Sequence, residues 1–156
     1  MKLRYFGALV GCLALAACDS DKEEAITTTE DSAQVDTGTA ADFIATAGDR
    51  VFFELNKHDL SPEAKATLER QAAWWKAHPD KEFVVEGHCD ERGTREYNLA
   101  LGERRANQAI GFLVDYGVSE NHIRGYSCGK DRPFEILGAN KEEFWRQNRT
   151  AVTVVQ

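Results

Sequence analysis

Between residues 45 and 156 the sequence alternates short apolar runs with longer segments of helical periodicity. The runs at 51–53, 83–85 and 151–155 are apolar or β-branched and are bounded by polar or turn residues; together with 123–127 they predict four strands. The resulting β-α-β-α-β-(α)-β order predicts an α/β fold of the α+β sandwich type. In such a fold a mixed sheet has right-handed crossovers and helices packed against it.

The ends and the buried faces of the two longer helices can also be predicted. The first begins at Ser61, a preferred N-cap residue, and ends at His78, which precedes a proline. Gly117 stops the second. Trp74 cannot share the helical face of Trp75 and is therefore expected to be exposed. The residues expected to face the core are Leu68, Ala72 and Trp75 in the first helix, and Leu99, Ala106, Ile110 and Leu113 in the second.

Residues 1–17 have the pattern of a secretory signal peptide, with Lys2 and Arg4 before an apolar run and small residues before Cys18. About 12 apolar residues are too few to span a bilayer, which needs ~20. The pattern resembles the bacterial lipoprotein signal, which implies that Cys18 is lipidated and anchors the protein to a membrane outside the cytoplasm. An ordinary signal peptide cut nearby, or a retained membrane helix, are the alternatives.

Residues 18–44 are predicted to be a flexible acidic tether, since they hold few large apolar groups. Eight acidic residues and one lysine lie between Asp19 and Asp42, so they carry most of the net charge of −7. Residues 45–156, the predicted folded domain, are close to neutral. Because no basic face dominates, nucleic acid is not an expected partner.

Two cysteines, Cys89 and Cys128, remain in the predicted domain. An even pair in an oxidising compartment can form a disulfide. The alternative is that both are small buried residues that never meet.

The segment from Gly87 to Arg105 concentrates the polar residues that could bind a ligand. It follows a buried strand and runs into a helix, which is where open α/β sheets place their ligands. Asp90 and Arg105 could together bind a ligand that carries an ammonium and a carboxylate, because Asp accepts from the first and Arg donates to the second. Alternatively, the two residues neutralise each other as a structural ion pair.

The segment GHCDERGTREYNLALGERRAN resembles the signature of the OmpA-like peptidoglycan-binding domain, in the form carried by the peptidoglycan-associated lipoprotein (Pal) family. The resemblance extends over roughly residues 48–156. It implies an OmpA-like fold, no enzymatic activity and no cofactor. It also implies non-covalent binding to meso-diaminopimelate, the zwitterionic residue of the peptidoglycan stem peptide.

Carried over by motif position, the resemblance implies that Asp90 holds the ammonium and Arg105 the carboxylate of diaminopimelate. Replacing either would then weaken wall binding and leave the fold intact. Asn98 would assist from the helix. The further expected contacts are Glu91, Arg92, Gly93 and Thr94, through their backbone N–H groups, and Asn56 and Arg149 next to the first and last strands.

The sequence departs from the family pattern at three positions. Cys89 replaces the usual Thr or Ala, and Cys128 replaces the usual Tyr, which favours a Cys89–Cys128 disulfide at the rim of the site. Asp19 follows the lipid cysteine directly. In enteric bacteria this residue retains a lipoprotein in the inner membrane, so an inner-membrane location stays open beside the outer-membrane, periplasm-facing location that the family implies.

The sequence also bears on three other classes of function. A thiol hydrolase would need His88 and Cys89 to meet, but consecutive strand residues point to opposite faces. A zinc site of His88, Cys89, Asp90 and Cys128 has no CxxC or HxxxH spacing to support it, and no metal is expected. A protein-interaction module is compatible with wall binding: the resemblance implies TolB and other Tol components as partners, and a role in division and envelope integrity.

Overall fold

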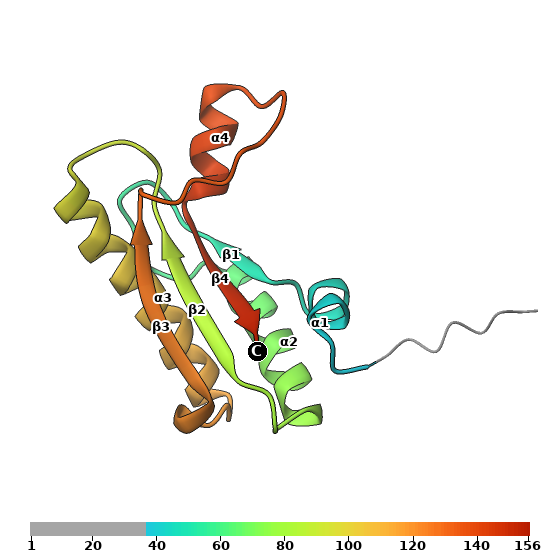
Figure 1. Ribbon diagram of the computed structural model, residues 1–156. Coiled ribbons are helices and arrows are strands. Elements are labelled where there is room, and N and C mark those ends of the chain that lie inside the picture. The colour runs from blue at the N-terminus through green and yellow to red at the C-terminus, as the bar shows by residue number, and fades with distance from the viewer. Residues whose placement is uncertain (1–36) are drawn as a thin grey trace, which may run out of the picture. The chain divides into compact units, whose positions relative to one another are not determined.

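The computed structural model describes residues 37–156; the predicted signal peptide, Cys18 and the tether up to residue 36 lie outside this range. Four strands form one sheet in the order β1-β4-β2-β3 (Figure 1). The strands are β1 (Arg50–Phe52), β2 (Phe83–His88), β3 (Ile123–Gly129) and β4 (Thr150–Val155), and the helices are α1 (Ala40–Thr46), α2 (Pro62–Ala77), α3 (Arg95–Asp115), the 3-10 turn η1 (Glu120–His122) and α4 (Lys141–Asn148).

The sheet is mixed, as the sequence predicts. β2 and β3 run parallel and are connected through α3, whereas β4 is antiparallel to both β1 and β2. Consequently the ends of β1 and β2 and the start of β4 meet at one end of the sheet. The loops at this end carry Asn56, Asp90 and Arg149, so the topology brings together residues far apart in the chain.

Helices α2 and α3 pack on the same side of the sheet (Figure 1). The predicted caps are confirmed: Ser61 accepts from the Ala64 N–H, and Gly117 has a positive φ of 96° after the end of α3. Leu68, Ala72, Trp75, Ala106 and Leu113 are buried as predicted. Leu99 is exposed instead, whereas Leu101, two residues further along the helix, is buried at the cleft described below.

A pair of glycines sets how closely α3 approaches β2. A Cβ on Gly102 would lie 2.7 Å from the Gly87 carbonyl oxygen, and a Cβ on Gly87 would collide with the Gly102 carbonyl. Real Cβ atoms do not approach backbone oxygens so closely, so both positions need a residue without a side chain. This contact places α3, two turns after its start, beside the end of β2.

Helix α1 corrects two predictions. The tether was expected to extend to residue 44, but Ala40–Thr46 is helical and Phe43 is buried in the core. Trp74 was expected to be exposed, but it is only 7 % exposed because α1 covers its face of α2. Its ring meets Phe43 edge-on, and its Nε1–H donates to Asp42 Oδ2 at 2.7 Å.

Candidate binding cleft

A narrow cleft, too tight in this structure to admit a water molecule, lies at the end of the sheet where β1 and β2 finish and β4 begins. Six of the residues predicted from the sequence line it, together with Leu55 and Leu101: Asn56, Cys89 (predicted as a disulfide partner), Asp90, Asn98, Arg105 and Arg149. A wider opening beside it, about 340 Å³, is lined by Leu55, Asn56, Arg92, Gly93 and Tyr97. The predicted contact residues therefore lie at one site, except Glu91 and Thr94, which line neither opening.

Asp90 is buried in this cleft but is not neutralised by Arg105. Its carboxylate accepts two hydrogen bonds from the Arg92 guanidinium, at 3.2 and 2.6 Å, and one from the Arg92 backbone N–H. Arg149 Nη1 lies 3.5 Å from Asp90 Oδ2. Burial by itself would raise the pKa of Asp90, but the hydrogen bonds and charges of Arg92 and Arg149 outweigh it and hold the pKa below its usual value. The aspartate is therefore an anion at neutral pH.

Arg105 is 1 % exposed and is a structural cation as well as a lining residue. Its guanidinium donates to the carbonyl oxygens of His88 at 2.7 Å, Lys57 at 2.9 Å and Glu54 at 3.2 Å. These bonds join the loop after β1 to the end of β2. Burial lowers the pKa of Arg105, although a guanidinium keeps its proton in proteins. The predicted structural ion pair between Asp90 and Arg105 is not formed in residues 37–156.

The loop between β2 and α3 is held by Asn98. The Asn98 side-chain amide donates to the carbonyl oxygens of Arg92 at 2.7 Å and Thr94 at 3.1 Å. Gly93 has a φ of +87°, and Thr94 caps α3 by accepting from the Tyr97 N–H. Asn98 therefore shapes the loop whose backbone N–H groups were predicted to bind a ligand.

Asn56 and Arg149 close the cleft from the β1 and β4 sides. Asn56 has a φ of +59°, the one positive value found for a non-glycine residue in the part of the chain that the structure describes. Such backbone conformations occur often at ligand sites, where surrounding structure enforces them. Arg149 Nε donates to the Phe53 carbonyl at 3.0 Å, whereas Arg149 Nη1 is buried with no hydrogen-bond acceptor. This N–H group is available to a ligand.

Sequence reasoning did not identify the role of the side chains at the rim of the cleft. The Arg92 guanidinium stacks on the Trp145 ring of α4 at 4.0 Å, and Trp145 Nε1–H donates to the exposed Glu91 carboxylate at 3.0 Å. Leu55 and Tyr97 are exposed at the wider opening. These contacts depend on where α4 lies, which no spacing within the motif could have revealed.

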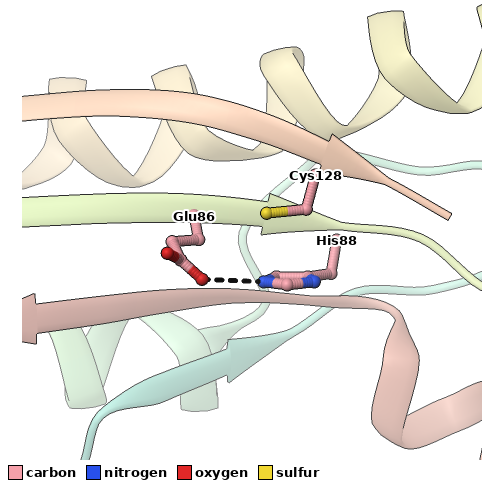
Figure 2. Close-up of side chains that lie close together, drawn as sticks. All are labelled: Glu86, His88 and Cys128. Carbon is pink, nitrogen blue, oxygen red and sulfur yellow. Dashed lines mark hydrogen bonds and ion pairs between the residues drawn. The ribbon is translucent and has the colours of Figure 1, made fainter. Parts of the chain in front are cut away.

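The predicted disulfide is wrong: Cys89 and Cys128 are both free thiols. Cys89 Sγ lies on the α3 side of the sheet, 3.3 Å from the Asn98 carbonyl oxygen. Cys128 Sγ lies on the other side, near His88 and Glu86 (Figure 2). His88 lies on the same side of the sheet as Cys128 and cannot reach Cys89. The pair of histidine base and cysteine nucleophile that a thiol hydrolase needs is therefore not formed by these two residues. Burial also raises the pKa of the Cys89 thiol to about 11.

Comparison with known proteins identifies relatives of this fold. The family described as the OmpA family matches residues 52–144. The peptidoglycan-associated lipoprotein of Rhizobium meliloti is 43 % identical over 155 residues, which cover 95 % of this chain and 85 % of that protein. The protein of the same name from Brucella melitensis is 46 % identical over 118 residues, covering 76 % of this chain and 69 % of that one.

Solved structures give the same result. The crystal structure of the peptidoglycan-associated lipoprotein from Burkholderia pseudomallei superposes with a TM-score of 0.67 at 32 % identity, covering 76 % of this chain and all of that one. The C-terminal domain of Helicobacter pylori MotB shares the fold, with a TM-score of 0.62 at 21 % identity, over 69 % of this chain and 84 % of that one. Within residues 37–156, no helix is both long and apolar enough to cross a membrane.

Proposed function

Because the chain belongs to the OmpA family, and within it to the peptidoglycan-associated lipoproteins, we propose that it binds peptidoglycan non-covalently through the cleft around Asp90. The ligand is the diaminopimelate residue of the stem peptide. Its side chain ends in an ammonium and a carboxylate on one carbon. The cleft has the matching groups, since Asp90 is an anion and cationic groups lie within a few ångströms of it.

The observation that carries this proposal is Arg149 Nη1, a buried N–H group that has no hydrogen-bond acceptor and lies 3.5 Å from Asp90 Oδ2. Leaving a buried donor unpaired costs about 1–3 kcal/mol. A bound carboxylate would accept from this group, while the ammonium of the same ligand donates to Asp90. A zwitterion therefore satisfies both groups, which a simple anion or cation does not.

In this proposal the Arg92 guanidinium occupies, in the unbound protein, the position next to Asp90 that the ligand ammonium takes on binding. Its guanidinium pairs with Asp90, yet a third of its side chain is exposed and its other contact is the Trp145 ring. On binding, the ammonium replaces the guanidinium at Asp90 and Arg92 keeps its stacking contact with Trp145. Arg105 and Asn98 hold the walls of the cleft, and backbone N–H groups from Glu91 to Thr94 add hydrogen bonds.

Lipid on Cys18 would hold the other end of the chain in a membrane, which we propose to be the outer membrane, facing the periplasm. Three acyl chains provide the multiple signals that stable anchoring requires. Many anchored copies that face a repeating polymer gain from high effective concentration even when each contact is weak. The result is a set of reversible links between the membrane and the wall, serving envelope integrity and cell division.

A second proposed partner is TolB, with other Tol components, and the rim of the cleft favours it. Leu55 and Tyr97 are large side chains that remain exposed beside the wider opening. Exposed aromatic side chains are enriched at the apolar centre of protein-binding surfaces. A protein bound there would cover the cleft, so TolB and peptidoglycan would compete for the protein.

Co-sedimentation of the full chain with purified sacculi tests the wall-binding proposal. Wild-type protein should pellet, and free diaminopimelate should release it. Asp90→Asn should weaken binding at least about tenfold, the value of one charge-assisted hydrogen bond. Asp131→Asn is the matched control, because Asp131 is an exposed carboxylate that pairs with Arg95 outside the cleft. Equal binding by the two variants would refute the assignment of Asp90.

A further inference from the structure

A second cluster of polar side chains lies on the face of the sheet opposite α2 and α3. Glu86 and His88 are two residues apart on β2 and so point to the same face, and Cys128 joins them from β3 (Figure 2). The register between the strands shifts at this point, where His88 pairs with Gly129 and Cys128 is the extra residue. Such bulges redirect side chains. One carboxylate oxygen, one imidazole nitrogen and the sulfur all lie within 4.8 Å of one another.

The His88 ring is oriented as in a metal ligand. Its Nδ1 lies 3.2 Å from the Arg132 carbonyl oxygen, which can only accept a hydrogen bond, so Nδ1 carries a hydrogen. Metal-binding histidines commonly donate their second N–H to such a carbonyl. Nε2 then faces Glu86 Oε2 at 3.4 Å. Phe134 packs against the buried ring at a centroid distance of 4.7 Å and limits its rotation.

The geometry points to a binding site for a divalent transition metal of the zinc class, with Cys128 Sγ, His88 Nε2 and Glu86 Oε2 as ligands. Zinc bonds of about 2.0–2.1 Å to nitrogen and oxygen at a tetrahedral angle place those two atoms about 3.3 Å apart. The distance between His88 Nε2 and Glu86 Oε2 is 3.4 Å. Thiolate and imidazole ligands favour zinc over magnesium or calcium. A water molecule would complete the fourth position.

His88 and Cys128 are buried, so a metal ion would enter past the partly exposed groups that surround the cluster. Glu86 uses its other oxygen, Oε1, to accept from the exposed Tyr126 hydroxyl, so Oε2 stays directed at His88. Arg132 Nη1 lies 3.6 Å from Glu86 Oε1 and 3.5 Å from Cys128 Sγ. Most of the Arg132 side chain is exposed, so this cation can turn into solvent when a metal ion enters. Binding replaces the thiol proton: the S–H bond breaks, an S–metal bond forms and one proton passes to water.

This site is separate from the cleft around Asp90. Cys89 and Asp90, which sequence reasoning had considered as zinc ligands with His88 and Cys128, lie on the α3 side and are not part of it. The ligands come from two strands, so none of the short spacings typical of zinc motifs occurs. A metal ion here would connect β2 to β3, which is the edge strand of the sheet.

Metal titration of the full chain tests this inference. Cys12→Ser and Cys18→Ser form the background, because they remove the thiols outside the described residues. Co²⁺ should give a thiolate charge-transfer band at one equivalent, and Zn²⁺ should displace it. Cys128→Ser should abolish the band, and His88→Gln and Glu86→Gln should weaken Zn²⁺ binding at least about tenfold against a competing chelator. His58→Gln, a histidine outside the cluster, is the matched control and should bind as the background does.

Thermal unfolding gives a second, independent measurement. Zn²⁺ should raise the Tm of the background protein and of His58→Gln, but not that of Glu86→Gln. Because Glu86→Gln keeps the size of a partly exposed side chain, it tests the site even where Cys128→Ser fails to fold. A thiolate band that persists in Cys128→Ser would assign the metal to Cys89 and overturn the inference. Zn²⁺ affinity that is equal in Glu86→Gln, His88→Gln and the control would overturn it as well.

Discussion

Asp90 and Arg105 line the same cleft, yet each is held by other groups. Arg105 donates to the carbonyl oxygens of the loop after β1 and of the end of β2. Asp90 is held by Arg92 and Arg149. The cation is thus fixed in the framework, while the anion is paired with a partly exposed guanidinium that a ligand can displace. The two residues should therefore respond differently to mutation.

Arg105→Ala should destabilise the fold, in contrast to the expectation from the motif that the fold stays intact. The substitution leaves three carbonyl oxygens, two of them in the loop after β1, without their donor. We expect the free energy of unfolding to fall by about 3 kcal/mol or more. Urea unfolding measures this change. Arg104→Ala, an exposed arginine one position earlier, should change it by less than about 0.5 kcal/mol; a similar loss in both would contradict the assignment.

The contribution of Asp90 to the free energy of unfolding should be lost as the pH falls into the acid range. The folded-state pKa of Asp90 is held below its unfolded value of about 3.9. A lowered pKa adds stability that is present above the unfolded value and is lost as pH falls through the folded one. Asp90→Asn should therefore be less stable than wild type at neutral pH, and the two should converge as the pH falls below 3.9. Urea unfolding at several pH values measures this; a constant difference would argue against the lowered pKa.

The close approach of α3 to β2 predicts opposite effects for two glycines in one helix. Gly102→Ala should destabilise by about 1–3 kcal/mol, because the new Cβ meets the Gly87 carbonyl oxygen at 2.7 Å. Gly111→Ala meets nothing within 4 Å and should stabilise by about 0.5–1 kcal/mol, because alanine restricts the unfolded chain. Thermal and urea unfolding of both variants should give changes of opposite sign, and equal signs would disprove the packing argument.

Helix α1 should be an integral part of the folded domain. Phe43→Ala removes a ring that is 1 % exposed and packs against Trp74 and Phe83, so we expect a loss of about 3–5 kcal/mol. Ile44→Ala is the control, since Ile44 is 54 % exposed and should lose less than about 1 kcal/mol. Equal stabilities would show that the domain starts after α1.

The strand and helix order could be predicted because each element has a local signal: the apolar run of β2, the Ser61 cap, the stop at Gly117. Apart from Leu99, the predictions that were wrong concern contacts between distant segments. Trp74 is buried because α1 covers it, and the sequence before α1 is too polar to predict such packing. The two cysteines end neighbouring strands, as a disulfide requires. Their sulfurs lie on opposite faces, which depends on the register that pairs Glu86 with Tyr126 and so places Cys128 on the face of His88.

The site residues were predicted better than their roles. The motif located Asp90, Asn98 and Arg105 because a strand, a loop and a helix bring them together within 16 residues. Several of their partners could not be predicted, since Glu54 and Lys57, which accept from Arg105, and Arg149, which faces Asp90, lie far away in the chain. The buried Arg149 Nη1 without an acceptor is likewise visible only in three dimensions.

The path of β1 through the domain has a mechanical consequence. The chain enters at α1, passes directly into β1 and reaches the cleft at the other end of that strand (Figure 1). A pull between an anchored N-terminus and a ligand held in the cleft would act along the strand axis. The hydrogen bonds between β1 and β4 run across that axis, so they would be sheared together instead of peeled one after another.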